Sequence, residues 1–184
     1  MTKFILLLIV LTGAGLSTFA QTSKLGNFSL GLDGGLPTYT ERQIFNVAVG
    51  GSFQFQYKII SHLYVNAIGG YESFATIKHL ESVNVISNYD YVPIKAGLRG
   101  YIKWGLFMEA NAGTCIYCQH GGGHGDDFMG GIGCSFKKGF ELSFHYEEWK
   151  QQPEHHVSTQ LGRTGPFVSP DNFGQIAVRI SERF

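Results

Sequence analysis

The chain has 184 residues, of which 14% are aromatic, 15% are charged and 25 are glycine, and its formal net charge at pH 7 is zero. This length predicts one domain, and the balanced charge gives no support for nucleic-acid binding. The apolar content is too high for a disordered chain, and the glycines lack the period of three that collagen requires.

Residues 1–20 have the pattern of a secretory signal peptide. Lys3 supplies the positive start, an apolar segment follows, and Thr18 and Ala20 are small residues at the −3 and −1 positions. The alternative, a membrane-spanning helix, needs about 20 apolar residues, and this stretch is shorter. We therefore expect cleavage before Gln21.

Beyond this segment the apolar residues follow a period of two, without a helical pattern or the strand–helix alternation of a Rossmann-type enzyme. From Phe45 to Tyr57 every second residue is apolar, aromatic or glycine, and the residues between them are small or polar. The same alternation recurs from Phe140 to Tyr146 and near the C-terminus. It predicts eight strands, at residues about 25–36, 44–57, 61–74, 86–102, 105–118, 127–137, 139–150 and 172–184.

The connections between these strands alternate in length. Short turns are expected at residues 58–60, 103–104 and 137–138, and long loops at 36–43, 75–85, 119–126 and 151–171. This layout is typical of membrane barrels, whose short turns face the periplasm and whose long loops face outward. The predicted fold class is all-β, with residues 21–184 forming an eight-stranded antiparallel up-and-down transmembrane β-barrel. Pro93 cannot donate a ladder hydrogen bond, so we expect it at a bulge near the outer rim.

The residues between the apolar positions indicate which face of the sheet meets lipid. Eight charged residues fall there, namely Asp33, Lys95, Arg99, Glu109, Glu141, Glu147, Arg179 and Arg183. An arginine or lysine that faces the middle of a membrane costs about 2–4 kcal/mol, so these side chains are expected inside the barrel. The alternative is a soluble lipocalin-type barrel or sandwich with its apolar face inside.

Aromatic residues favour the membrane barrel, because they gather near both ends of the predicted strands, as belts at two membrane interfaces do. Those near the short turns are Tyr57, Trp104, Phe136, Phe140 and Phe184. Those near the long loops are Tyr71, Phe74, Tyr89, Tyr91, Tyr117, Tyr146, Trp149 and Phe173.

Eight strands enclose an interior that side chains fill, which argues against a wide pore. The turn at 103–104 places Arg99 opposite Glu109, and Glu141 is expected at the level of Arg179 or Arg183 on the neighbouring strand. We predict that these five residues form a charge-paired interior network, because an unpaired buried charge is costly. A proton or ion path along the same residues is the alternative.

The final stretch from Ile176 to Phe184 alternates to the last residue and ends on an aromatic side chain. It resembles the C-terminal strand of bacterial outer-membrane proteins, and this resemblance gives Phe184 the role of an assembly signal. The stretch from Tyr91 to Tyr101, and Gln21 after the expected cleavage site, are similar to small eight-stranded outer-membrane barrels of the Bacteroidetes type, which resemble the OmpX and OmpA barrels and include relatives of PorT. The resemblance implies an outer-membrane location, with outer-membrane lipid, lipopolysaccharide and the barrel-assembly machinery as partners.

A hydrolytic site is one alternative function. Some small barrels modify lipids at the outer rim, and His145 and Glu147 share a strand face, with Ser158 later in the chain. Lipid A deacylases of this architecture carry a His-x-Ser-Asn motif, whereas here Glu147 stands at the position of the nucleophilic serine. We therefore expect no enzyme and no catalytic residues.

A metal site is a second, weaker possibility. Cys115, Cys118, His120 and His124 are dense enough to suggest zinc or copper, although their spacing matches no known zinc module. A local disulfide between the two cysteines competes, but in a straight strand they would point to opposite faces. A flexible glycine-rich loop is the third interpretation of this segment. We expect no metal and no cofactor.

The longest loop, residues 151–171, holds His155, His156 and Arg163 among polar residues. Long loops on a rigid scaffold carry binding sites, so a surface ligand and a solvated loop without a ligand are both open. We expect a non-enzymatic protein that acts in envelope integrity, surface binding or adhesion. A rim-located lipid-modifying hydrolase, and a narrow channel or secretion accessory of the PorT kind, are the alternatives.

Overall fold

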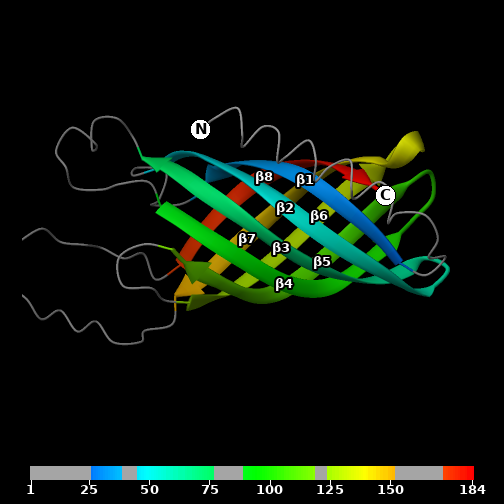
Figure 1. Ribbon diagram of the computed structural model, residues 1–184, viewed down its shortest axis with the longest axis horizontal. Coiled ribbons are helices and arrows are strands. Elements are labelled where there is room, and N and C mark those ends of the chain that lie inside the picture. The colour runs from blue at the N-terminus through cyan, green and yellow to red at the C-terminus, as the bar shows by residue number, and fades with distance from the viewer. Residues whose placement is uncertain (1–25, 39–44, 77–88, 119–123, 152–171) are drawn as a thin grey trace, which may run out of the picture.

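The computed structural model describes residues 26–38, 45–76, 89–118, 124–151 and 172–184. They form one closed barrel in which each strand pairs antiparallel with its neighbours in the chain and the first strand pairs with the last (Figure 1). The strands are β1 (Gly26–Pro37), β2 (Phe45–Ile60), β3 (Leu63–Thr76), β4 (Tyr89–Tyr101), β5 (Leu106–Tyr117), β6 (His124–Ser135), β7 (Phe140–Gln151) and β8 (Asn172–Arg183). The predicted eight-stranded antiparallel barrel is confirmed.

The strand boundaries agree with the prediction to within a few residues. β6 begins at His124 rather than at residue 127, because its first residues pair with the end of β5. β2 continues to Ile60 through a register shift after Lys58, so the first short turn falls at residues 61–62 and the prediction of 58–60 is wrong.

The other two short turns lie where they were expected. Trp104 and Gly105 adopt positive φ angles of 61° and 81° between β4 and β5, a conformation that is uncommon for a residue other than glycine. A single turn of 3₁₀ helix, η2 (Lys137–Gly139), joins β6 to β7. We call the end of the barrel that carries the three short turns and the C-terminus the inner end, and the opposite end the outer end. The inner end lies on the right in Figure 1.

Pro93 interrupts one ladder without forming a bulge. β4 keeps a single register with β3 from Gly100 to Tyr89, but no pairing joins Val92 and Pro93 to that strand. On its other side Pro93 pairs regularly with Cys115 of β5. The predicted bulge is therefore wrong, because the missing N–H is accommodated by a short gap in the β3–β4 ladder.

The alternation of side chains separates an apolar exterior from a polar interior. Leu32, Ile94 and Phe144 are exposed by 74%, 50% and 52%, whereas Arg99 is exposed by only 1%. Soluble monomers rarely expose so large a continuous apolar surface, whereas the outward face of a membrane barrel is apolar because it contacts lipid. The soluble alternatives, which place the apolar face inside, are therefore wrong. Among the described residues, no helix is long and apolar enough to cross a membrane.

Inward-facing glycines make room for the long polar side chains. A Cβ atom added to Gly31 would lie 2.5 Å from Nε of Arg179, and one added to Gly50 would lie 2.4 Å from Cγ of Glu72. Both distances are far below van der Waals contact, so a larger residue at either position would displace the charged side chain beside it.

Candidate functional site in the barrel interior

The charged residues of the polar face all lie on inward-facing positions. Asp33, Lys95, Arg99, Glu109, Glu141, Glu147 and Arg179 are each exposed by 8% or less. The side chain of Arg183, at the inner end of β8, is exposed by 27%. The interior is therefore the part of the described chain in which chemistry-bearing groups gather.

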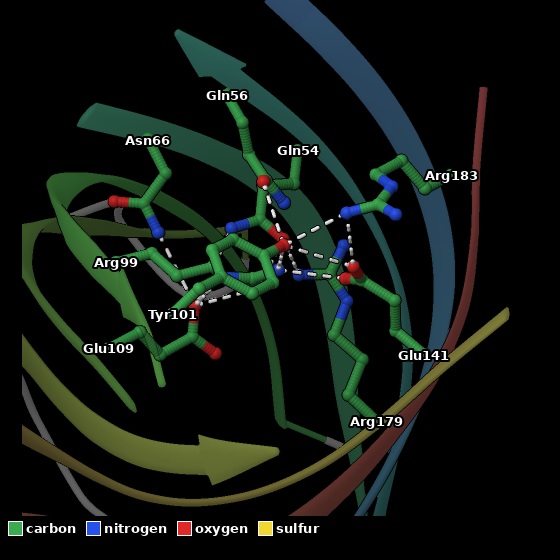
Figure 2. A network of polar contacts seen from close by, with 9 residues as sticks. All are labelled: Gln54, Gln56, Asn66, Arg99, Tyr101, Glu109, Glu141, Arg179 and Arg183. Carbon is green, nitrogen blue, oxygen red and sulfur yellow. Dashed lines mark hydrogen bonds and ion pairs between the residues drawn. The ribbon is translucent and has the colours of Figure 1, made fainter. Parts of the chain in front are cut away.

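One set of these residues, the inner network, is drawn in Figure 2, and its members stand in the parts of their strands nearer the inner end. Its side chains come from β2, β3, β4, β5, β7 and β8, and they converge across the lumen. The network comprises Gln54, Gln56, Asn66, Arg99, Tyr101, Glu109, Glu141, Arg179 and Arg183.

Arg99 is the centre of the inner network. Its Nη2 lies 2.9 Å from Oε2 of Glu109, and its Nη1 lies 2.7 Å from Oε2 of Glu141. Nη2 also donates to Oε1 of Gln54 at 3.0 Å, and the guanidinium carbon lies 4.0 Å from the ring centroid of Phe107. One guanidinium thus links four strands across the barrel, which closes the lumen at this level.

The five charges expected to form a network all belong to the inner network, but their pairing differs in part from the expectation. Arg99 and Glu109 lie together, and Arg183 lies 3.2 Å from Glu141. Arg179 instead donates from Nη1 to Oε1 of Gln54 at 2.8 Å, and within the described ranges it has no carboxylate within ion-pair distance. The bond to β2 was not anticipated, because it passes over β1 and joins two strands that do not pair with each other.

The uncharged members of the network were missed by the sequence reasoning. Gln56, Asn66 and Tyr101 hydrogen-bond the carboxylates directly or through one another; Tyr101 donates to Glu141 at 3.2 Å, and Asn66 donates to Glu109 at 3.3 Å. Gln56 and Asn66 are buried, Tyr101 is half-buried, and all three point into the lumen (Figure 2). Their parity with Arg99 and Gln54 was the signal that could have identified them.

A second set, the outer network, lies nearer the outer end and comprises Glu72, Tyr91, Lys95, Asp127, His145, Glu147 and Gln175. Lys95 forms an ion pair with Glu147 and lies 3.5 Å from Asp127. Nε2 of Gln175 donates to Glu72 at 2.8 Å and to Glu147 at 3.3 Å, and Tyr91 donates to Glu72 at 2.5 Å. The Gln175–Glu72 bond and the Lys95–Glu147 ion pair link strands that do not pair with each other, whereas the other hydrogen bonds link neighbouring strands.

Aromatic side chains close the lumen beyond the outer network. This aromatic cap consists of Phe45, Phe74, Tyr91 and Trp149, packed with Ala48 and Cys115 and flanked by Tyr89 and Tyr117. The ring centroids of Tyr91 and Trp149 are 4.8 Å apart, and those of Phe74 and Trp149 are 5.8 Å apart. Glu72, Asp127 and Glu147 of the outer network are exposed by 5% or less beneath these rings.

The aromatic cap corrects the prediction of an outer aromatic belt. Phe74, Tyr91 and Trp149 were expected at the lipid interface, but they are exposed by 2% or less inside the barrel. Tyr71 and Tyr146 do face outward, and the Phe173 side chain lies outside what the structure describes.

The belt at the inner end is present. Tyr57, Trp104, Phe136 and Phe140 are exposed by 47%, 90%, 47% and 43%. Exposed rings of this kind lie at the headgroup level of a membrane and fix the depth of the barrel.

The hydrolase candidates lie away from the rim. His145 and Glu147 face the lumen with exposures of 4% and 0%, and Nε2 of His145 is 3.8 Å from Oε2 of Glu147. A base that acts on a membrane lipid must be within reach of its substrate, and neither side chain touches the exterior. Ser158 lies outside the described residues.

The described metal-site candidates differ in burial and do not share one environment. Cys115 is buried in the aromatic cap, Cys118 and His124 are exposed, and His120 falls outside the described ranges. Both cysteines are free thiols, and the Sγ of Cys115 contacts the hydroxyl of Tyr117 at 3.5 Å. In the part of the chain that the structure describes, no three His, Cys, Asp or Glu side chains are grouped as metal ligands.

Comparison with solved structures finds other transmembrane barrels. The crystal structure of Ail, the attachment invasion locus protein of Yersinia pestis, gives a TM-score of 0.54 at 12% identity, with coverage of 88% of this chain and 100% of Ail. Ail in a phospholipid bilayer nanodisc gives 0.52 at 10% identity, with coverage of 88% and 100%. A de novo designed transmembrane β-barrel gives 0.50 at 12% identity, with coverage of 88% and 98%.

No protein-family model matches the chain, and no curated protein matches it. At such low identity the structural likeness shows the fold alone, which is that of small outer-membrane barrels. Together with the apolar exterior, this fold places the protein in the bacterial outer membrane.

Proposed function

We propose that the protein is a closed, non-enzymatic outer-membrane scaffold that acts through its outer loops in surface binding, adhesion or envelope integrity. The observation that carries the proposal is the filled lumen. The inner network, the outer network and the aromatic cap occupy successive levels, and each joins strands on opposite sides of the barrel. A barrel whose lumen is filled at three levels offers solutes no path through it. We therefore assign the function to the outer surface of the protein, where its loops lie.

A conductance measurement tests the closed lumen. Purified protein in planar bilayers should give no discrete conductance steps above those of the lipid alone. Steps that change with Arg99→Met or Glu109→Gln would instead support the narrow channel, because those residues occupy the centre of the inner network. Secretion-accessory function of the PorT kind is an alternative to this proposal, and it rests on sequence resemblance, as does the proposed membership of the Bacteroidetes-type barrels.

Surface binding is the role favoured for the outer end. Ail, a barrel of the same fold, is the attachment invasion locus protein of Yersinia pestis, and its structure has also been solved in complex with the heparin analogue sucrose octasulfate. We place the corresponding site of this protein in residues 151–171, whose polar stretch holds His155, His156 and Arg163. Residues 152–171 lie outside the described structure, so this assignment rests on the sequence.

Deletion of residues 155–168 tests the role of this loop. The shortened protein should still change its mobility between unboiled and boiled gel samples, as folded barrels do, because both networks remain. Bacteria that carry it should lose adhesion to a layer of host cells, whereas those with the full chain adhere. Unchanged adhesion together with greater sensitivity to detergent in a strain that lacks the whole protein would assign it to envelope integrity instead.

The export and assembly steps are also proposals. Residues 1–20 would direct the chain across the inner membrane, and Phe184 would mark it for the barrel-assembly machinery. In the structure the backbone N–H of Phe184 donates to the carbonyl of Phe28 at 2.8 Å. The last residue therefore adjoins the seam where β1 and β8 close the barrel.

A further inference from the structure

An open cavity of about 400 Å³ lies at the inner end, where Tyr101 and Arg183 of the inner network form part of its lining. It is lined in part by Tyr64 and Ser61 near the β2–β3 turn and by Ser135, Phe136 and Lys137 near the β6–β7 turn. Arg183 forms its border with the inner network. A volume of this size suits a small molecule or the headgroup of a lipid.

The lining supplies several hydrogen-bond donors at once. Arg183 uses Nη1 to bond Tyr101 at 3.0 Å and to reach Glu141 at 3.2 Å, while part of its side chain is exposed to the cavity. Lys137 is exposed on the turn, and Ser61, Ser135 and Tyr64 add hydroxyl groups. Several donors around one space match a group with several acceptor oxygens, such as a phosphate.

The charge around the cavity is positive. Of the described residues that line it, none is acidic. Behind the lining, Glu141 is shared between Arg99 and Arg183, and Glu109 pairs with Arg99. These two carboxylates balance two guanidinium groups, and Arg179 stands opposite the carboxylate of Asp33 in the β1–β8 ladder, so the charge of Lys137 is the one left in excess at the lining. An anion at this position gains from that excess, and the neighbouring membrane face screens it less than bulk water does.

One wall of the cavity continues onto the lipid-facing surface. Phe136 lines the cavity, yet it is exposed by 47%, and its ring centroid is 5.7 Å from that of Phe140 on the outward face of β7. A phospholipid of the neighbouring leaflet can therefore place its headgroup in the cavity while its acyl chains stay against the barrel.

We propose that this cavity binds the phosphate group of a phosphate ester, held by Arg183 and Lys137. Two sources offer that chemistry, namely the headgroup of an anionic phospholipid in the inner leaflet and a soluble periplasmic phosphate ester. The continuity with the lipid-facing wall favours the phospholipid.

Calorimetric titration of the folded full-length barrel, in a maltoside detergent without phosphate, tests the proposal. The probes are short-chain phosphatidylglycerol, glycerol 3-phosphate, and diacylglycerol of the same chain length as the phosphate-free comparison. The test variant is Lys137→Gln, and the matched control is Lys103→Gln, which removes a lysine from the β4–β5 turn at the same end but outside the cavity lining. Loss of one charge-assisted hydrogen bond should weaken binding of the phosphate probe about tenfold.

The expected result is binding of phosphatidylglycerol that Lys137→Gln weakens and Lys103→Gln leaves unchanged, with no binding of diacylglycerol. Equal binding of glycerol 3-phosphate, with the same dependence on Lys137, would keep the phosphate site and assign it to a soluble ligand. Absence of binding by both phosphate probes would overturn the proposal, as would equal weakening by the two lysine variants. If Lys137→Gln fails to fold, Ser135→Ala removes another lining donor and takes its place in the same comparison.

Discussion

Replacement of Arg99 by methionine tests whether the inner network holds the barrel together. Arg99 is exposed by 1% and is bonded to Glu109 and Glu141, both of which are also buried. Methionine fills much of the same volume without charge, so the substitution removes the cation and leaves the two carboxylates in place. We expect a strong loss of stability for that reason.

The size of the effect follows from what each carboxylate retains. Glu141 keeps Arg183 at 3.2 Å, whereas Glu109 keeps, among the described residues, only weak contacts from Gln54 and Asn66, at 3.5 and 3.3 Å. Removing one partner of a buried ion pair costs about 3–5 kcal/mol. Arg183→Met is the control, because its side chain is 27% exposed, and its loss should cost about 1 kcal/mol or less.

The assay is unfolding by urea from lipid vesicles, followed by tryptophan fluorescence. The two tryptophans, Trp104 at the inner end and Trp149 in the aromatic cap, report on both ends of the barrel. Glu109→Gln in the Arg99→Met background should restore about 2 kcal/mol, because the stranded carboxylate is gone. A loss below about 1 kcal/mol for Arg99→Met, or full additivity of the two substitutions, would refute the reasoning.

Three further predictions concern the barrel wall and its assembly. Gly97→Ala should abolish the heat-dependent gel shift, because its Cβ would lie 2.0 Å from the carbonyl oxygen of Ala110, whereas Gly69→Ala should be neutral, with nothing within 4 Å. Ile94→Arg, on the lipid-facing side of β4, should lower the free energy of unfolding in vesicles by about 2–4 kcal/mol, and Ile94→Leu by less than about 1.5 kcal/mol; equal effects would contradict the membrane assignment. Phe184→Ala should slow the appearance of folded protein in cells but leave refolding of the purified chain into detergent unchanged; a matching defect in refolding would indicate a packing role instead.

Much of the fold was accessible from the sequence, because a barrel wall repeats one local rule. Each strand alternates between lipid and lumen, so Arg99 and Glu109 could be assigned to the interior without knowledge of their partners. The turn between β4 and β5 fixes their register, and the structure pairs these two residues directly. Local alternation and hairpin geometry are therefore sufficient to predict which residues face the lumen and which residues pair across a hairpin.

The predictions that the structure contradicts concern two situations. In one, the alternation of side chains along a strand is interrupted or was misjudged; in the other, the contact joins strands that are not neighbours. Phe45 follows the odd positions of β2 in the sequence, but a register shift between Phe45 and Val47 turns its ring into the lumen. Trp149 was assigned to a lipid belt from its distance along the strand, although its parity matches the inward-facing Glu147. The bond from Arg179 to Gln54 passes over β1 and depends on closure of the barrel between β8 and β1, which no single hairpin encodes.

The interior bonds also constrain the order of events during insertion. Gln54 and Arg179 are 125 positions apart in the chain, and Glu72 and Gln175 are 103 apart. Such contacts form only when the last strand has met the first, and contacts between distant residues slow folding. A sheet that entered the bilayer while still open would expose Arg179 to hydrocarbon, at about 2–4 kcal/mol for each such cation near the midplane. The sheet must therefore close into a barrel while it inserts. The charged lumen thus couples the closure of the barrel to its insertion into the membrane.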